Sequence, residues 1–411
     1  METEVCIIGA GPAGLMAAIH SAVAGARTAI VEANTTAGRK LLITGGGRCN
    51  ITHQAEPKEL VRAFGAKGRF LSFCLYEYPP QFVQNFFAGL GLQTKVLEDD
   101  CVFPVSERAV DVRDVLVNRA KKLGVRFLYD KRVSDITKDT DTFTVRTQSE
   151  QVSAKKIIIA TGGLSWPKTG CTGDGYRFAR RFGHSIIEPR PSLVPLVAKE
   201  NWPIRLAGTA VEKVRVSAYI NNKKINTTGA LIFTEDGIGG PVVWDMSRYI
   251  TDYLPAAEKP LTITLDLLPD FNQTEFEKQV TDLAGANPKK KVVNIVAELL
   301  PKRLASFLCG RAGYDDELAA GRLKKDVRKK LTAIIKSLPL SIVRTRPIEE
   351  AIVTRGGVGI DEINPKTMES KICPGLYFAG EVLDVDGPCG GFSLHVCWST
   401  ATLAGASAAN F

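Results

Sequence analysis

The sequence predicts an α/β protein in which both ends of the chain build one domain and the middle forms an inserted domain. Three observations support this prediction. A glycine-rich loop follows an apolar strand close to the N-terminus, a second pair of apolar strand and glycine loop stands near the C-terminus, and a β-rich and then helical stretch lies between them.

The N-terminal loop has the order that dinucleotide binding requires. An apolar strand at 5–8 leads into Gly9, Gly11 and Gly14, a helix follows, and a second apolar strand ends at Glu32. Gly9 allows the tight turn, Gly11 lets the backbone approach a pyrophosphate, and Gly14 lets helix and strand pack closely. The helix N-terminus favours phosphate, and Glu32 can accept the ribose hydroxyls. This pattern predicts a cofactor with an ADP moiety.

The overall composition limits the classes of protein that remain. The 411 residues suggest two or three domains, and no apolar run approaches the roughly 20 residues that span a membrane. The first strand begins almost at residue 1, which leaves no room for a signal peptide. Nine cysteines without a CxxC pair and four scattered histidines predict a reducing cytoplasm and no metal site.

Two further glycine loops follow in the N-terminal half. The stretch 44–50 reads TGGGRCN, and consecutive glycines suit a backbone that lies flat against a ligand ring. Arg48 in this loop would meet a phosphate or the edge of a reduced flavin; the alternative is a mobile surface loop. A buried strand at 156–159 then ends in Thr161-Gly162-Gly163, the type of turn that closes over a nucleotide.

The other elements of this half follow from periodicity. We expect helices over 58–92, a turn at 102–104 before a helix that runs to 123, strands at 125–128 and 143–146, and a helix from Tyr176.

The character of the chain changes at Pro189-Arg190-Pro191. We assign residues 1–190 to the first part of the cofactor domain and 191–345 to the inserted substrate-side domain, with a β-barrel at 191–270 and a basic helical part at 271–345. Residues 346–411 return to the cofactor domain.

The C-terminal segment indicates which cofactor is bound. A short apolar strand ends in Gly380-Glu381, and Gly390-Gly391 opens an Ala-rich helix. The acid suits a ribityl or phosphate-side hydroxyl, and the helix N-terminus suits the flavin pyrimidine edge, where charge collects on reduction. A nicotinamide enzyme does not need this returning segment, so we expect FAD.

With these motifs and the stretches 166–176 (WPKTGCTGDGY) and 380–387 (GEVLDVDG), the chain resembles the BaiN-like, aminoacetone-oxidase-like FAD-dependent oxidoreductases over its full length. The resemblance implies a glutathione-reductase-type FAD-binding Rossmann domain, with the inserted barrel and helices over the flavin. It also implies FAD contacts at Gly9, Gly11, Ala13, Gly14, Glu32, Arg39, Lys40, Gly46, Arg48, Asn50, Thr161, Gly162, Gly163, Gly380, Glu381 and Gly391.

The chain departs from this family pattern at two places. Asp100-Cys101 stands where the family usually has Gly-Arg before Val-Phe-Pro, and Phe392-Ser393-Leu394-His395 replaces the usual aromatic-Asn-x-Gln. Both departures concern the polar surroundings of the flavin ring.

Charge suggests the substrate. Members of the family have been assigned amine oxidation, redox steps on steroid-like acids and reduction of a uracil ring in ribosomal RNA. Residues 288–346 hold 15 Lys and Arg and 5 Asp and Glu, an excess of ten, against +9 for the whole chain. Ribosomal RNA explains such a concentration better than a small molecule does, and the alternative is a solvated helix face.

We therefore expect an FAD-dependent reductase of a uridine C5–C6 double bond in ribosomal RNA. Cys49, Cys389 or His395 would donate the proton, each with a structural role as its alternative. NAD(P)H would be a transient electron donor, since no second GxGxxG is present. The alternative functions are an oxidase of a small primary amine, which releases hydrogen peroxide, and a non-catalytic, flavin-bound RNA-binding protein.

Overall fold

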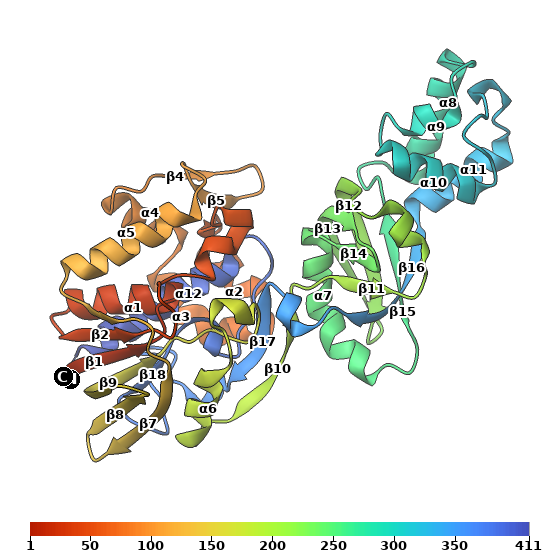
Figure 1. Ribbon diagram of the computed structural model, residues 1–411. Coiled ribbons are helices and arrows are strands. Elements are labelled where there is room, and N and C mark those ends of the chain that lie inside the picture. Colours follow the sequence, from red (N-terminus) through yellow and green to blue (C-terminus); the bar gives the residue numbers. More distant parts are fainter. Residues whose placement is uncertain (411) are drawn as a thin grey trace. The chain divides into compact units, whose positions relative to one another are not determined.

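The computed structural model describes residues 1–410 and divides into two compact units. The first unit combines residues 1–191 with the C-terminal residues from Ile348 on, and the inserted unit comprises residues 192–347. In Figure 1 the red N-terminal and blue C-terminal elements lie together in the first unit. The α/β fold with an inserted barrel and helices is confirmed.

A seven-stranded sheet forms the centre of the first unit. The strands are β1 (Glu2–Ile8), β2 (Thr28–Val31), β6 (Arg126–Leu128), β7 (Val133–Asp139), β8 (Thr142–Thr147), β9 (Gln151–Ile159) and β18 (Leu376–Phe378). Their order is β6-β2-β1-β9-β8-β7, with β18 also on β9. β6, β2, β1, β9 and β18 are parallel, so their carboxyl ends meet at one edge, where such folds bind ligands.

The helices of the first unit are α1 (Pro12–Val23), α2 (Pro57–Ala63), α3 (Gly68–Glu77), α4 (Pro80–Gly89), α5 (Ala109–Lys122), α6 (Asp174–Arg181) and α12 (Phe392–Ala408). α12 is buried along almost its whole length, which explains its apolar sequence. It packs tightly on α1, because a Cβ added to Gly405 would lie 2.3 Å from the Ala17 carbonyl oxygen.

Two small sheets complete this unit. β3 (Thr52–His53), β5 (Cys101–Pro104) and β4 (Thr94–Val96) form one, and β10 (Ile186–Ser192) pairs with β17 (Val353–Val358) in the other. The expected turn at 102–104 is wrong: these residues belong to β5, the buried central strand of its sheet. The run was too short for a strand to be recognised without its partners.

The inserted unit contains a closed barrel. Its strands are β11 (Leu196–Ala198), β12 (Ala210–Ile220), β13 (Lys223–Phe233), β14 (Gly237–Gly239), β15 (Leu261–Asp266) and β16 (Leu338–Thr345), in the order β11-β14-β13-β12-β15-β16. β16 closes the barrel on β11, and α7 (Pro241–Tyr253) packs beside β13. Buried residues alternate along β15 at Leu261, Ile263 and Leu265.

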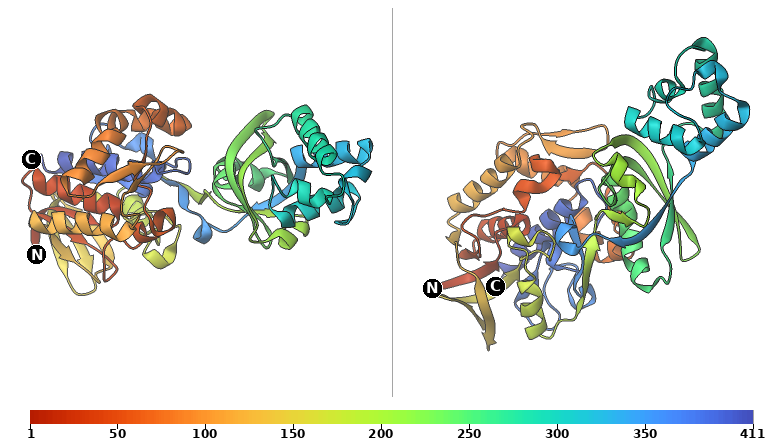
Figure 2. Two further views of the ribbon diagram at one scale, coloured as in Figure 1. Left: turned by 90° about the horizontal axis from the view of Figure 1, so that it is seen from above. Right: turned by 45° about the vertical axis from the view of Figure 1, so that its right-hand side comes forward.

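Four helices form the second part of the inserted unit: α8 (Gln273–Ala286), α9 (Val292–Val296), α10 (Lys302–Ala312) and α11 (Lys325–Lys336). Both views of Figure 2 show these teal to blue helices gathered at one end of the barrel. The expected helical part at 271–345 is too long, because 338–345 return to the barrel as β16. Leu338, Leu340 and Ile342 alternate into its core, a period-2 pattern that we missed.

Between residues 1 and 410, no helix is both long enough and apolar enough to cross a membrane. In the same part of the chain, no group of three or more His, Cys, Asp or Glu side chains is arranged to hold a metal ion.

Candidate functional site

The glycine loop between β1 and α1 has the geometry that its sequence predicts. Gly9 has a φ of 101°, and a Cβ there would lie 2.7 Å from the Ala160 carbonyl oxygen. A Cβ on Gly14 would lie 1.9 Å from the Gly9 carbonyl oxygen, whereas a Cβ on Gly11 would meet nothing within 4 Å. The backbone is therefore packed at the first and third glycines and open at the second. No side chain caps α1, so its first N–H groups remain available to a phosphate.

Glu32 lies at the end of β2 beside this loop and is 7% exposed. One carboxylate oxygen accepts the Ala10 N–H at 2.6 Å, and the other accepts the Asn34 backbone N–H at 2.8 Å. The Asn34 side-chain oxygen in turn accepts a hydrogen bond from Arg39 at 2.7 Å. These bonds fix the acid next to the N-terminus of α1, where a ribose beside a pyrophosphate would need it.

A buried polar network joins the two ends of the chain. The Lys40 ammonium lies 2.9 and 2.7 Å from the two Glu381 oxygens and 2.6 Å from the Ser165 hydroxyl. Glu381 also accepts the Thr354 N–H at 2.8 Å. Burial acts to lower the pKa of Lys40, but the charge of Glu381 and its hydrogen bonds together raise that pKa above its usual value. Lys40 is therefore charged, and its contacts with Glu381 and Ser165 help to hold residues 40, 165, 354 and 381 together.

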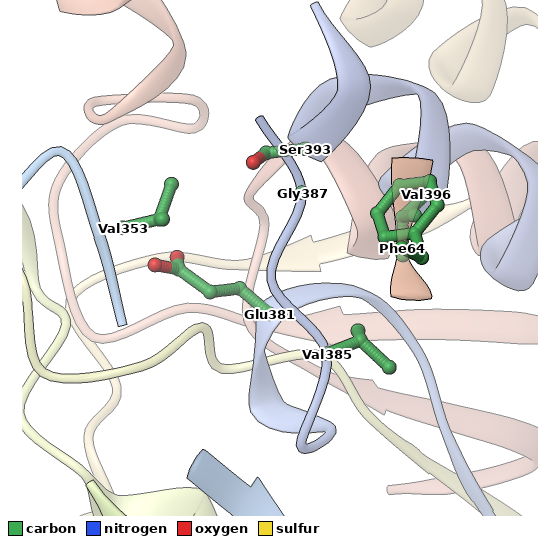
Figure 3. Close-up of a pocket in the computed structure, with 7 residues that line it drawn as sticks. All are labelled: Phe64, Val353, Glu381, Val385, Gly387, Ser393 and Val396. Atoms are coloured by element: carbon green, nitrogen blue, oxygen red, sulfur yellow. The ribbon is translucent and has the colours of Figure 1, made fainter. Parts of the chain in front are cut away.

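A pocket opens beside this network (Figure 3). Its lining comes from several elements of the first unit: Phe64, Val353, Glu381, Val385, Gly387, Ser393 and Val396. Glu381 and Ser393 supply polar atoms, and the other side chains are apolar. The cavity is small, about 10 Å³, which is room for roughly one water molecule, so it borders the site and does not by itself hold a larger ligand.

The Gly-rich loop at 44–47 has left-handed backbone at three successive positions, with φ of 56°, 67° and 88° at Gly45, Gly46 and Gly47. A Cβ on Gly46 would meet nothing within 4 Å, so this backbone is open. Arg48 points to a different partner than we expected. Its guanidinium lies 4.6 Å from the centre of the Phe103 ring and 4.0 Å from Glu107.

The N-terminus of α12 is held by the segment that follows this loop. With its amide oxygen turned to the helix, Asn50 accepts the Gly391 N–H at 3.2 Å, and its amide nitrogen donates to the Thr52 carbonyl at 2.9 Å. A Cβ on Gly391 would lie 2.4 Å from that carbonyl. Asn50 therefore places α12 against β3 in this structure.

The three expected proton donors have different surroundings. Cys49 is wholly buried, and burial raises the pKa of its thiol to about 12. His395 is wholly buried on α12, where burial lowers its pKa to about 4, and its Nδ1 lies 2.8 Å from the Thr52 hydroxyl. Cys389 is half-buried and directly precedes the two glycines at the start of α12.

Sequence reasoning missed His53, which lies among these residues. Its ring stacks on Phe392 with a 4.5 Å separation of centroids, and its Nδ1 donates to the Gly390 carbonyl oxygen at 3.1 Å. In the β3–β5 pairing, His53 stands opposite Cys101. No short-range motif marks His53. Only the pairing of β3 with β5 and the return of α12 bring it to this position.

The residues present fit FAD. Gly11 and Gly46 leave open backbone, and α1 offers uncapped N–H groups beside Glu32. The Thr161 hydroxyl, at the end of β9, is buried without a hydrogen-bond partner among the described residues, as expected for a group that a ligand completes. FAD would be held by the α1 loop, Glu32, the 161–163 turn and the N-terminus of α12.

Comparisons with known proteins agree with this site. The family model described as "HI0933-like protein Rossmann domain" matches residues 3–407. A 3-dehydro-bile acid delta(4,6)-reductase from Clostridium scindens is 31% identical over 99% of both chains. The ribosomal RNA dihydrouridine synthases of Haemophilus influenzae and Escherichia coli are 32% and 31% identical, over 97% of this chain and 96% of theirs.

Solved structures share the fold at low identity. The 3-ketosteroid-delta4-(5alpha)-dehydrogenase from Rhodococcus jostii has a TM-score of 0.53 at 17% identity, over 100% of this chain and 97% of its own. A flavocytochrome c3 fumarate reductase has a TM-score of 0.53 at 18% identity, over 99% of this chain and 78% of its own.

Proposed function

We propose that this chain, which belongs to the HI0933-like family and is an FAD-dependent oxidoreductase, reduces the C5–C6 double bond of a uridine in ribosomal RNA. Two relatives that align with nearly the whole chain are named ribosomal RNA dihydrouridine synthases. A third relative is named a reductase of a bile acid. Reduction of an unsaturated ring is therefore common to these names. The basic charge of the inserted unit favours an RNA substrate over a small acid.

The observation that carries the proposal is the position of cations at two helix starts. α10 begins with Lys302 and Arg303, has no acid in its first turn and has no side-chain cap. α11 follows Lys324, begins with Lys325 and also lacks a side-chain cap, although it has one acid, Asp326, in its first turn. The helix macrodipole makes such ends favourable for anions and unfavourable for cations. The start of α10 has cations and no acid, a local mismatch that is typical of a functional site, and a phosphate chain would bind favourably at both helix starts.

Most cations of this segment are available for such a partner. Among the 15 Lys and Arg of 288–346, ion pairs join Lys290 to Glu298, Lys291 to Glu317, Arg328 to Glu277, Lys336 to Asp266 and Arg346 to Asp236. The other ten have no carboxylate within 4 Å in the described part of the chain. Lys324, Lys325, Lys329 and Lys330 are all exposed. Each would release counterions on meeting an RNA phosphate.

The first unit would supply the chemistry. FAD, when bound and reduced, would supply the hydride that one uracil carbon receives. The chain's own part is to hold the ring, exclude water and protonate the other carbon. The N-terminus of α12, with left-handed glycines at 390 and 391 and no side-chain cap, would stabilise negative charge that develops there. NAD(P)H is the proposed electron donor, and the cytoplasm is the proposed compartment.

Mass spectrometry of ribosomal RNA from cells with and without the gene tests the proposal. We expect one dihydrouridine to disappear on deletion and to return with the intact gene. The variant with Lys324, Lys325, Lys329 and Lys330 all changed to Glu should not restore it. A matched control changes Lys223→Glu and Lys224→Glu, exposed residues at the β12–β13 turn of the same unit, and should restore it fully.

Other outcomes would contradict the RNA function. If ribosomal RNA is unchanged by deletion, the basic helices are a solvated surface, and the purified protein should be assayed with steroid-like acids and, for peroxide release, with small amines. If a variant that has lost FAD still restores the RNA phenotype, the protein acts as a non-catalytic RNA-binding protein.

A further inference from the structure

Reduction of a carbon–carbon double bond needs a proton as well as a hydride, and the three expected donors do not supply one equally well. Cys49 and His395 have no exposed surface. The Cys49 thiol, with a pKa of about 12, holds its proton strongly, and His395, with a pKa of about 4, carries no second proton at neutral pH. A donor at the start of α12 therefore has to be sought among the half-buried groups.

His53 has the geometry of an oriented acid. A carbonyl oxygen only accepts, so the 3.1 Å contact with Gly390 requires a hydrogen on Nδ1 of His53. The second proton of the imidazolium then belongs to Nε2, which has no partner among the described residues. Stacking on Phe392 and the bond to Gly390 together fix the ring at the start of α12. An imidazole fixed at one nitrogen and open at the other is the usual arrangement of a general acid.

Two segments that are far apart in the sequence border His53. Cys101 lies opposite His53 in the β3–β5 pairing. Phe392 stacks on its ring, and His395 contacts the preceding residue, Thr52. A Cβ built on Gly390 would lie 3.4 Å from the Cys101 sulfur and 3.5 Å from His53 Nδ1. The side chain of His53 is therefore enclosed by β5 on one side and the start of α12 on the other.

We propose that His53 donates the proton that completes reduction of the substrate double bond, and this inference rests on the proposed function. Reduced FAD, held by the α1 loop and the start of α12, would supply the two electrons as a hydride to one carbon. The Nε2–H bond of His53 breaks, and its proton forms the C–H bond at the other carbon. The neutral imidazole regains a proton from water, so the net reaction adds two electrons and two protons to the substrate.

The other titratable groups around His53 are few. They are the thiols of Cys101 and Cys389, the carboxylates of Asp99 and Asp100 in the turn before β5, and His395 on α12. Burial raises the pKa of Cys101 to about 12, which leaves that thiol uncharged. Between residues 1 and 410, no carboxylate pairs with His53.

Single-turnover reduction of substrate by the pre-reduced holoenzyme tests the proposal. In the unaltered protein the rate should fall as pH rises, because the donor must carry its proton. In His53→Asn, which can still donate to Gly390, the rate should drop by about 10²- to 10⁴-fold and lose this pH dependence. Gln54→Ala, at an exposed neighbour, is the matched control and should leave the rate and its pH profile unchanged.

A second readout does not depend on turnover. The chain has four histidines, so the NMR signal of the His53 ring can be assigned by its absence in His53→Asn. We expect this signal to shift when FAD is added to the apoprotein. His20 and His395, whose pKa values burial lowers to about 4, should remain uncharged at neutral pH in the same spectra.

The inference fails if His53→Asn retains the rate and its pH dependence, if Cys389→Ser rather than His53→Asn abolishes that dependence, or if FAD leaves the His53 signal unmoved. Failure of the proposed function looks different. The unaltered protein would then leave uridine unreduced, while the NMR result would still stand and the rate assay would be repeated on a steroid-like enone.

Discussion

The first unit and the helical part of the inserted unit place their charges differently. Glu381 and Asp384 of the first unit keep 14% and 5% of their side-chain surface exposed, and both pair with lysines. Glu298 and Glu317, which pair with lysines among α9 to α11, are 42% and 75% exposed. Buried pairs cost much to desolvate and persist where they fix a geometry, whereas exposed pairs add little to stability. The pairs of Lys40 and Lys67 therefore fix the geometry of the first unit, and the exposed lysines near α9 to α11 are available to a partner. One pair of the helical part is buried like those of the first unit: Lys336 and Asp266, 12% and 14% exposed, join α11 to β15.

Low pH should reveal the largest difference between the two units, because it should destabilise the first unit more than the inserted unit. Burial lowers the pKa of His20 and His395 to about 4, and both lie in the first unit, whereas residues 192–347 contain no histidine. The unfolded chain binds these protons from about pH 6.5 downward and the folded chain only near pH 4. Stability is thus lost as pH falls through that window, by about 3 kcal/mol for each imidazole. Hydrogen exchange at pH 7 and pH 5, corrected for intrinsic rates, should show larger losses of protection in the first unit. Equal losses in both units would contradict this.

Breaking a buried ion pair should have the next largest effect. Lys40→Ala leaves the Glu381 carboxylate without its cation and should lower the free energy of unfolding by roughly 3–5 kcal/mol. Lys290→Ala, which removes the exposed partner of Glu298, should change it by less than about 1 kcal/mol. Calorimetry of both variants measures the contrast. Similar losses would show that the Lys40–Glu381 pair is no more important than a surface pair.

Two helical glycines should respond to alanine in opposite directions. In Gly405→Ala the new Cβ would lie 2.3 Å from the Ala17 carbonyl oxygen, and we expect a loss of about 1–3 kcal/mol. In Gly310→Ala on α10 the Cβ meets nothing within 4 Å, and the better helix propensity should add about 0.5–1 kcal/mol. Thermal unfolding of the pair checks the signs. A stabilising Gly405→Ala would mean that α1 and α12 can separate without cost.

The smallest expected effect concerns the start of α11. Lys324→Glu with Lys325→Glu places acids at a helix N-terminus and should raise stability by about 0.3–1 kcal/mol, even though RNA binding is lost. Urea unfolding at low ionic strength measures the gain, which added salt should reduce. If the variant is destabilised, those lysines contribute to the fold, and their value as evidence for an RNA partner falls.

Local patterns made much of the fold predictable. The spacing of Gly9, Gly11 and Gly14 between two apolar strands gave the cofactor loop, and Gly390 and Gly391 marked the start of the last helix. β16 was missed because a strand that follows basic helices looked like their continuation, and its partners, β11 and β15, lie far upstream. β5 was missed because four residues carry too little periodicity.

The site was less predictable than the fold. Lys40 and Glu381 are 341 residues apart, and no spacing rule relates them. His53 reaches the start of α12 through one strand pairing and one ring stack, both of which depend on the completed fold. Cys49 and His395 proved to be buried and are therefore not accessible groups. The sequence shows the type of each residue but not the solvent exposure of its side chain.

The positions of β18 and α12 in the sequence determine when the first unit can complete its fold during synthesis. Both come from the last 40 residues, yet β18 pairs with β9 and α12 packs on α1. Synthesis adds roughly 5–20 residues per second, so the inserted unit has emerged whole while the first unit still lacks a strand and its central helix. The inserted unit can therefore fold first, while the first unit is still incomplete. During that interval the apolar face of α1 and the free edge of β9 are the parts of the nascent chain most in need of a chaperone.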